Sequence, residues 1–251
     1  MAMNDSIGDR MKRYERVSNH VLVRRMPVIV RVDGRAFHTF TRAYARPFDA
    51  RIINWMVAAA KAVFKDMQGC KLAYVQSDEA SFLLTDYDTH ETQAWFDNEL
   101  QKIVSISAAL MSGVFTTRYI AARIAAGISI DFQAMKPPMF DSRAFNVPRE
   151  EVANYFLWRA KDWERNSLQM YARANFSHKE LQNKNSADIH EMLHAKGLNW
   201  AMDLTAQQKN GTWIRHTANT VMSGSTIKPT YEDIANAVDP LLAPAIVKED
   251  A

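Results

Sequence analysis

The chain has 251 residues, 47% of them hydrophobic and 24% charged, a balance that is typical of a globular protein and excludes disordered and fibrous classes. Its single cysteine, Cys70, cannot form an internal disulfide, and the first residues contain no apolar signal peptide. No uncharged apolar run approaches the ~20 residues of a membrane span. We therefore expect a cytoplasmic protein with no membrane partner.

The net charge of +3 conceals an uneven distribution of charge along the chain. Residues 10–51 contain eleven Lys or Arg against three acidic residues, a local charge of +8, while residues 86–99 are acidic. A basic stretch suits a phosphate-rich partner, although a solvated face balanced by another face explains it equally well. With eight glycines in all, the chain has little material for a glycine-rich phosphate loop.

The pattern of apolar residues predicts six elements in the first half of the chain. In chain order they are a strand, a helix, two strands of a hairpin, a helix and a strand, at residues 26–33, 47–67, 71–76, 79–85, 89–115 and 126–132. This is the order of a split βαβ, or ferredoxin-like, arrangement. The predicted fold class is therefore α+β, with a βαββαβ core.

A Lys-Pro-Pro sequence at residues 136–138 marks the predicted boundary between a core region, residues 1–135, and a mainly helical C-terminal region, residues 136–251, packed on it. In the second region we expect a short extended piece at residues 142–147, a long helix from Pro148, a second helix at residues 187–196 and a strand at residues 212–217. The last twenty-odd residues are expected to be helical and then frayed.

Two aspartates stand at the ends of strands that should be neighbours. In a ferredoxin-like sheet the first and third strands are antiparallel neighbours, so Asp33, at the end of the first, should meet Asp78, at the start of the third. Two close carboxylates repel each other, and a bound divalent cation removes that cost. Asp oxygens with few other protein ligands suit Mg²⁺, and two such ions can clamp the attacking and leaving oxygens in a displacement at phosphorus.

Each of these signals also has a plain structural explanation. Asp-Gly and Ser-Asp are common turn pairs, so neither Asp33 nor Asp78 points to a metal on its own, and Glu79 fits a solvated flank. Only the expected convergence of the two aspartates favours a metal site. Residues 35–38 could offer backbone N–H groups and a guanidinium to a triphosphate.

Longer motifs carry a resemblance to a known family. RVDGRAFHTFT (residues 31–41) and YVQSDEASF (residues 74–82) resemble the two signature motifs of the tRNA-histidine guanylyltransferase family, whose members add nucleotides in the 3′-to-5′ direction. FDSRAFNVP (residues 140–148) and YFLWRAKDW (residues 155–163) are similar to its later motifs. The resemblance covers residues 8–200 and implies a core like the palm of polymerases, two Mg²⁺ ions, ATP and GTP as substrates, tRNA as partner and a homotetramer.

The resemblance also implies which residues form the site. The metal ligands would be Asp33, the Gly34 carbonyl and Asp78, with Glu79 as a supporting catalytic acid beside the two aspartates. The nucleotide-binding residues would be Asp33, Gly34, Arg35, Ala36, Phe37, His38, Arg46, Ser77 and Asp78. The candidate tRNA contacts, which also fit a solvated helix face, are Arg143, Arg159, Arg165 and Asn166.

In the family's reaction the 5′-monophosphate of tRNA attacks the α-phosphate of ATP, and the 3′-hydroxyl of a nucleoside triphosphate then attacks the activated end and releases AMP. Eukaryotic members carry His-x-Asn-Asn in the long helix, where this chain has ERNS at residues 164–167. That departure, and SIGDRMKRYE at residues 6–15, are similar to the bacterial and archaeal branch. The family's Lys-Pro is Arg46-Pro47 here. We therefore expect template-directed repair of 5′-truncated tRNA, with guanylation of histidine tRNA as a further activity.

Residues 190–194, HEMLH, offer a rival metal site. They match the H-E-x-x-H signature of zinc metalloproteases, in which His190 and His194 would share a helix face and Glu191 would act as general base. Trp200 occupies the place of the third histidine of the longer motif, so another ligand such as His216 would be needed.

Two further alternatives remain open at the level of the sequence. They are a nucleotide cyclase, which also uses a two-metal palm, and a non-catalytic tRNA-binding module. The tryptophans at helical positions favour the core or an interface over base-stacking platforms, namely Trp55, Trp95, Trp158 and Trp163.

Overall fold

The computed structural model describes residues 6–216, 221–224 and 227–243. The strands in these ranges form one six-stranded sheet in the order β4-β1-β3-β2-β5-β6, in which all neighbours are antiparallel. They are β1 (Val28–Gly34), β2 (Cys70–Gln76), β3 (Glu79–Leu84), β4 (Phe140–Asn146), β5 (Thr212–His216) and β6 (Val221–Gly224). The first four stand in the ferredoxin-like order, so the predicted α+β class and βαββαβ core are confirmed.

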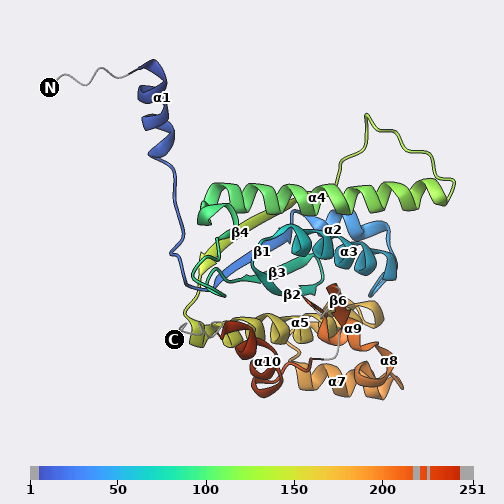
Figure 1. Ribbon diagram of the computed structural model, residues 1–251. Coiled ribbons are helices and arrows are strands. Elements are labelled where there is room, and N and C mark those ends of the chain that lie inside the picture. The colour runs from blue at the N-terminus through green and yellow to red at the C-terminus, as the bar shows by residue number, and fades with distance from the viewer. Residues whose placement is uncertain (1–5, 217–220, 225–226, 244–251) are drawn as a thin grey trace.

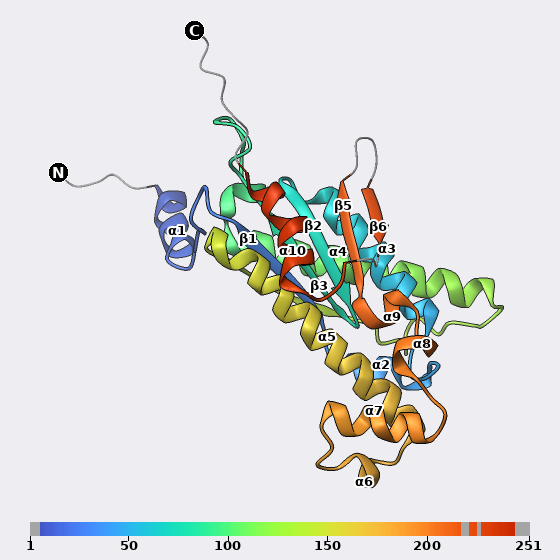
Figure 2. The same ribbon diagram turned by 90° about the horizontal axis from the view of Figure 1, so that it is seen from below.

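Helices cover both faces of the sheet (Figures 1 and 2). They are α1 (Ile7–Arg16), α2 (Phe37–Phe40), α3 (Ala50–Asp66), α4 (Leu100–Ala125), α5 (Val152–Asn175), α6 (His178–Leu181), α7 (Ser186–Ala195), α8 (Trp200–Asp203), α9 (Ala206–Asn210) and α10 (Tyr231–Val238). α3 and α4 pack on one face, around Val30 and Val32, whereas α5 and α10 pack on the other, around Ile29. Successive side chains of β1 enter different cores because a strand directs them alternately to its two faces.

The C-terminal region is mainly helical, as expected. A third, smaller core joins α5 to α7 through Leu168, Ile189 and Leu193, away from the sheet. α10 confirms a helix near the C-terminus, and the predicted frayed end at residues 244–251 lies outside the described residues.

The fourth core strand is not where the sequence placed it. Residues 126–132 contain no strand, and β4, at Phe140–Asn146, pairs with β1 instead. Ile128 and Phe132 are 47% and 65% exposed, whereas β4 buries Phe140 and Ala144 in the core under α4. The segment predicted as a short extended piece, residues 142–147, therefore belongs largely to the edge strand β4. It takes this place because β4 buries apolar side chains on one face, whereas Ile128 and Phe132 of residues 126–132 are exposed. The division of the chain at residues 135 and 136 stays a prediction, and the sheet takes strands from both sides of it.

The second core helix begins at Leu100, so the prediction of a helix from Thr89 is wrong. Residues 89–99 form turns and a short 3-10 segment, in which Phe96, Asp97 and Asn98 have φ of 50°, 50° and 62°. Three successive left-handed residues cannot continue a right-handed helix. The helix then extends to Ala125, ten residues beyond its predicted end at Phe115.

α4 is long and apolar enough to span a membrane by length and composition alone, which the sequence prediction missed. A helix packed on a sheet satisfies the same two criteria. α4 packs on the sheet through Ile103, Met111 and Phe115, and much of its opposite side is exposed.

Candidate active site

The two predicted carboxylates meet at the end of β1. In the β1–β3 ladder Asp33 is the register partner of Glu79, which directly follows Asp78. The Gly34 N–H donates a 2.9 Å hydrogen bond to the Asp78 carbonyl, so the end of β1 is tied to the tip of the β2–β3 hairpin. The structure therefore brings Asp33, Gly34 and Asp78 together, as the strand order predicted.

The hairpin tip holds the Asp78 carboxylate in one orientation. Ser77 has a left-handed φ of 48°, and its hydroxyl donates a 2.9 Å hydrogen bond to Asp78 Oδ1. The other carboxylate oxygen lies over Gly34, where a Cβ would stand 2.8 Å from Oδ2 and 2.4 Å from Cδ2 of Phe37. Glycine is needed here for space, because the carboxylate and the Phe37 ring occupy the room that a side chain would take.

Burial makes ionisation of both carboxylates costly. It raises the pKa of Asp78 to about 6, with the charge of Asp33 adding to the shift and the hydrogen bond from Ser77 opposing it. Burial and the charge of Asp141 raise the pKa of Asp33, although Arg143 and other nearby arginines act in the opposite direction. A cation between the two aspartates would remove the repulsion, so this oxygen donor pair fits a divalent ion.

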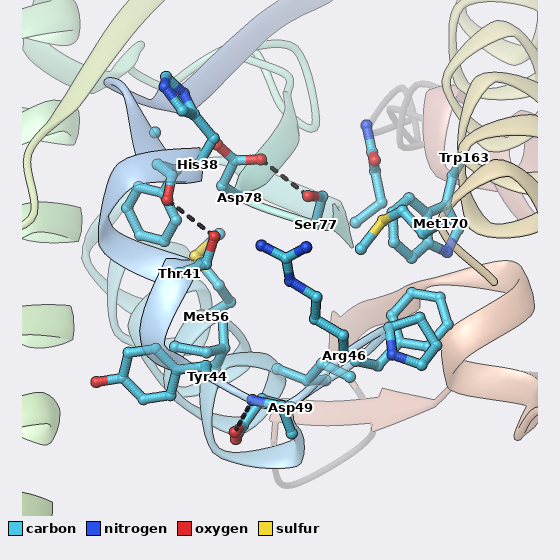
Figure 3. A pocket seen from close by; sticks show the side chains of 18 of the residues that line it. His38, Thr41, Tyr44, Arg46, Asp49, Met56, Ser77, Asp78, Trp163 and Met170 are labelled. Atoms are coloured by element: carbon cyan, nitrogen blue, oxygen red, sulfur yellow. Dashed lines mark hydrogen bonds between the residues drawn. The ribbon is translucent and has the colours of Figure 1, made fainter. Parts of the chain in front are cut away.

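A cavity of about 550 Å³ opens beside the two carboxylates (Figure 3). Its polar side carries His38, Ser77 and Asp78, and the Arg46 guanidinium reaches into it toward Ser77. The rest of its wall is mostly apolar, with Met56 and Val57 from α3, Val75 from β2, and Trp163 and Met170 from α5. A cavity with an apolar body and a charged end suits a nucleotide, which has a flat base and an anionic phosphate chain.

A second cavity of about 400 Å³ lies between the carboxylates and α5. Asp33 and Asn166 line only this cavity, while Ser77, Asp78 and Arg173 line both. Asp78 therefore stands where the two cavities adjoin.

Glu79 is engaged by an arginine of α5. The Arg159 Nε and Nη2 groups each donate a 2.7 Å hydrogen bond to the Glu79 carboxylate, and both side chains are buried. Asp162 accepts a weaker bond of 3.3 Å from the same guanidinium. Arg159 thus already holds two carboxylates, although it also lines the smaller cavity, and its role as a tRNA contact stays a prediction. Glu79 lines the smaller cavity together with Asp33 and Asp78, in a position to support them.

The other predicted residues divide into those that reach the cavities and those that do not. Phe37 is buried, and its ring packs against those of Phe40 and Phe115. The cavity-lining residues among the predictions are Asp33, Gly34, Ala36, Phe37, His38, Arg46, Ser77, Asp78, Glu79, Arg159 and Asn166. Arg35 is exposed and lines neither cavity, although its N–H donates a 2.8 Å bond to the Met139 carbonyl.

The candidate tRNA contacts on the surface already have partners. Arg143 pairs with Asp141 at 3.0 Å, and Arg165 pairs with Asp162. Asn166 donates a 3.2 Å hydrogen bond to the same Asp162. Arg143 and Arg165 are exposed, so solvent-weakened ion pairs leave both able to exchange partners.

Sequence reasoning named Arg159 and Asn166 of α5 but missed Trp163, Met170 and Arg173, which also line the cavities. Trp163, Asn166, Met170 and Arg173 follow one another at intervals of three or four residues and so lie on one face of the helix. That spacing is visible in the sequence, but only the packing of α5 on the sheet shows that this face looks toward the aspartates.

The HEMLH motif does not form a three-ligand metal site. His190 and His194 are exposed on α7, and no group of three or more His, Cys, Asp or Glu side chains suited to a metal occurs in the part of the chain that the structure describes. His216 packs on Phe64 at 4.7 Å, on the α3 side of the sheet, while α7 packs on α5 on the opposite side. The predicted third ligand is therefore out of reach.

A ferredoxin-like antiparallel sheet with two aspartates at one end, beside a cavity with an apolar wall and a charged end, is an arrangement that suits an enzyme acting on nucleotides. The family model described as tRNAHis guanylyltransferase (Thg1) matches residues 8–148, and the chain belongs to this family. The resemblance that the motifs carried is confirmed, and the protein is an enzyme of the nucleotidyltransferase class.

The similarity between this chain and known proteins extends over most of its length. The tRNA(His) guanylyltransferase of Schizosaccharomyces pombe is 28% identical over 227 residues, which are 85% of this chain and 82% of that protein. A bacterial Thg1-like protein solved in complex with ATP is 39% identical with a TM-score of 0.85, covering 95% of this chain and 99% of that one. A bacterial Thg1-like protein solved in complex with GTP matches at 35% identity and a TM-score of 0.77, over 94% of this chain and 99% of that one.

Proposed function

We propose that this protein is a magnesium-dependent enzyme that adds nucleotides in the 3′-to-5′ direction to the 5′ end of tRNA. The observation that carries the proposal is the convergence of Asp33, the Gly34 backbone and Asp78 where two cavities adjoin. A second support is the likeness to bacterial Thg1-like proteins solved with ATP and with GTP.

Asp33, the Gly34 carbonyl and Asp78 would hold the Mg²⁺ ions. All three donors are oxygens, and the two carboxylates are raised in pKa by burial and by neighbouring negative charge. When bound, the ions would neutralise phosphate charge as bonds at phosphorus form and break. Ser77 orients Asp78, and Glu79 is proposed as a supporting acid.

ATP and GTP are the proposed nucleotides. The larger cavity would hold the base against its apolar wall, and Arg46 would contact the triphosphate. Residues 36–38 also line this cavity, and their backbone N–H groups would bind the remaining phosphate oxygens.

The proposed reaction has two displacements at phosphorus. An oxygen of the tRNA 5′-monophosphate attacks the α-phosphorus of ATP, and pyrophosphate leaves. The 3′-hydroxyl of the incoming nucleoside triphosphate then attacks the activated 5′-phosphorus, its proton passes to solvent, and AMP leaves. Two cavities that meet at Asp78 are what such a sequence requires, since the nucleotide and the RNA end must approach the same carboxylates.

Repair of 5′-truncated tRNA is proposed over dedicated guanylation of histidine tRNA. Residues 164–167, ERNS, stand on α5 where the eukaryotic motif would require His-x-Asn-Asn. Asn166 at that position lines the smaller cavity.

A homotetramer in the cytoplasm is also proposed. The exposed side of α4 offers a hollow lined by Ile106, Leu110, Val114 and other side chains, an apolar surface suited to a second subunit. The lone Cys70 is buried and free, as expected in a reducing compartment.

A single incubation tests the proposal. The protein is mixed with a 5′-monophosphorylated tRNA that lacks its first nucleotide, ATP, labelled GTP and Mg²⁺, and label in the tRNA is measured. We expect incorporation that requires Mg²⁺ and is lost in Asp33→Ala and Asp78→Ala but retained in Asp66→Ala, an exposed aspartate at the end of α3. Unchanged incorporation after either site substitution contradicts the proposal, and a cyclic product from GTP alone would identify a cyclase.

A further inference from the structure

Trp158 is exposed on α5, unlike the other tryptophans that the sequence assigned to the core or an interface. Its side chain is 55% exposed, whereas Trp55, Trp95 and Trp163 are at most 9% exposed. A large aromatic ring left in solvent beside a polar site is available to a planar ligand.

The ring of Trp158 is held in place by its neighbours. Tyr155 meets it edge to face at 5.9 Å between centroids, and the Arg159 guanidinium lies 4.5 Å from its centroid. Both neighbours are fixed in turn, since Arg159 is bonded to Glu79 and the Tyr155 hydroxyl lies 2.7 Å from that of Ser81. A ring fixed in this way loses little conformational entropy when a base stacks on it.

Two arginines stand beside this tryptophan on the sheet. Arg31 and Arg143 are directly opposite each other on β1 and β4, an arrangement that like charges disfavour. The Arg31 guanidinium lies 6.0 Å from the Trp158 ring, its Nε is buried without a hydrogen-bond partner, and no described acidic residue forms an ion pair with it. Arg143 is bonded only to Asp141, and both are about half exposed. The pair therefore offers positive charge to an anion from outside.

The same residues lie next to the carboxylates. Arg31 and Arg143 both favour the ionised form of Asp33, which stands two residues after Arg31 on the same face of β1. Arg159 connects Trp158 to Glu79, the register partner of Asp33.

We propose that Trp158, Arg31 and Arg143 form a platform that holds one nucleotide of the RNA strand beside the active site. Its base stacks on Trp158 and its phosphate lies against the two arginines. The inference rests on the proposed function in one respect, that the substrate is RNA. The favoured occupant is a nucleic acid rather than a protein, because an exposed ring beside Arg31, which forms no ion pair with a described residue, and Arg143, whose only ion pair is half exposed, matches a base with its phosphate.

Binding of a fluorescently labelled, 5′-monophosphorylated tRNA, measured by anisotropy without nucleotides over a range of salt concentrations, tests the platform. Loss of one stacked base predicts roughly 5- to 100-fold weaker binding for Trp158→Ala. Trp158→Phe keeps an aromatic face and should restore most of the affinity. Arg143→Gln should lower the slope of log K against log salt by about one, the loss of one phosphate contact.

Matched controls are Tyr231→Ala, a comparably exposed aromatic residue on α10, and Arg215→Gln, an exposed arginine on β5, three strands away from β1 in the sheet. Neither should change binding by more than about twofold, a difference within measurement scatter. In the incorporation assay Trp158→Ala should raise the KM for tRNA and leave the KM for GTP unchanged, with an unaltered melting temperature.

Each outcome has one meaning. Wild-type affinity for tRNA in Trp158→Ala overturns the platform. A loss of binding that is explained by a change in oligomeric state also overturns it, because the ring would then serve a contact between subunits. Binding that depends on Trp158 in a protein that incorporates no nucleotide supports the platform while contradicting the proposed function.

Discussion

Replacing Arg159 by methionine tests how strongly the buried ion pair supports the active site. Glu79 and Arg159 are 6% and 8% exposed, and two hydrogen bonds of 2.7 Å join them. The substitution keeps an unbranched apolar side chain but leaves the Glu79 carboxylate buried without its charged partner. Breaking a buried pair from one side costs ~3–5 kcal/mol, which is a large part of the ~5–15 kcal/mol that stabilises a typical folded protein.

The free energy of unfolding is measured by guanidinium titration at neutral pH. Arg165→Met is the matched control, since Arg165 pairs with Asp162 on the same helix from a side chain that is 64% exposed. Its loss should cost less than ~1 kcal/mol. The double variant Glu79→Gln/Arg159→Met removes both charges, so we expect it to be more stable than Arg159→Met alone.

Two results would refute this reasoning. Arg159→Met within ~1 kcal/mol of the wild type would mean that water reaches Glu79 and replaces the guanidinium. If the double variant loses as much unfolding free energy as Glu79→Gln and Arg159→Met lose together as single variants, the two side chains do not interact.

Three further predictions concern the carboxylates and the rival metal motif. Gly34→Ala should lower kcat about 100-fold in the incorporation assay, because the new Cβ displaces the Asp78 carboxylate. In the native state the pKa of Asp78 is about 6, whereas in the unfolded state it has the ordinary value of 3.8. Between pH 3.8 and about 6 the native state therefore binds more protons than the unfolded state, so without Mg²⁺ the melting temperature should fall as pH rises through this interval. Asp78→Asn should reduce that fall, and an equal fall in both proteins would contradict it. His190→Ala should retain activity, and metal analysis of the wild type should find no stoichiometric zinc.

Local patterns in the sequence were sufficient to predict the hairpin and the aspartate pair. Alternating strand formers on both sides of Ser77 and Asp78 define the hairpin, and the order of elements then leaves one neighbour for the first strand. The meeting of Asp33 and Asp78 follows from connectivity, so no knowledge of side-chain packing was needed.

Only the tertiary structure decided between elements with similar local patterns. The sequence predicts a strand at residues 126–132 and a short extended piece at residues 142–147, yet it is β4, at Phe140–Asn146, that pairs with β1 and buries Phe140 and Ala144 under α4. Hydrogen-bond partners across the sheet are chosen by such burial, which a local window does not contain.

The partners of the residues on α5 were likewise invisible in the sequence. Arg159 and Trp158 are adjacent in the chain, yet one is buried against Glu79 and the other is exposed beside Arg31. Helical periodicity predicts that two adjacent residues point about 100° apart, but not which direction meets the sheet. That direction is set by where α5 docks, and it separates a residue that is bonded to Glu79 from one that is left exposed.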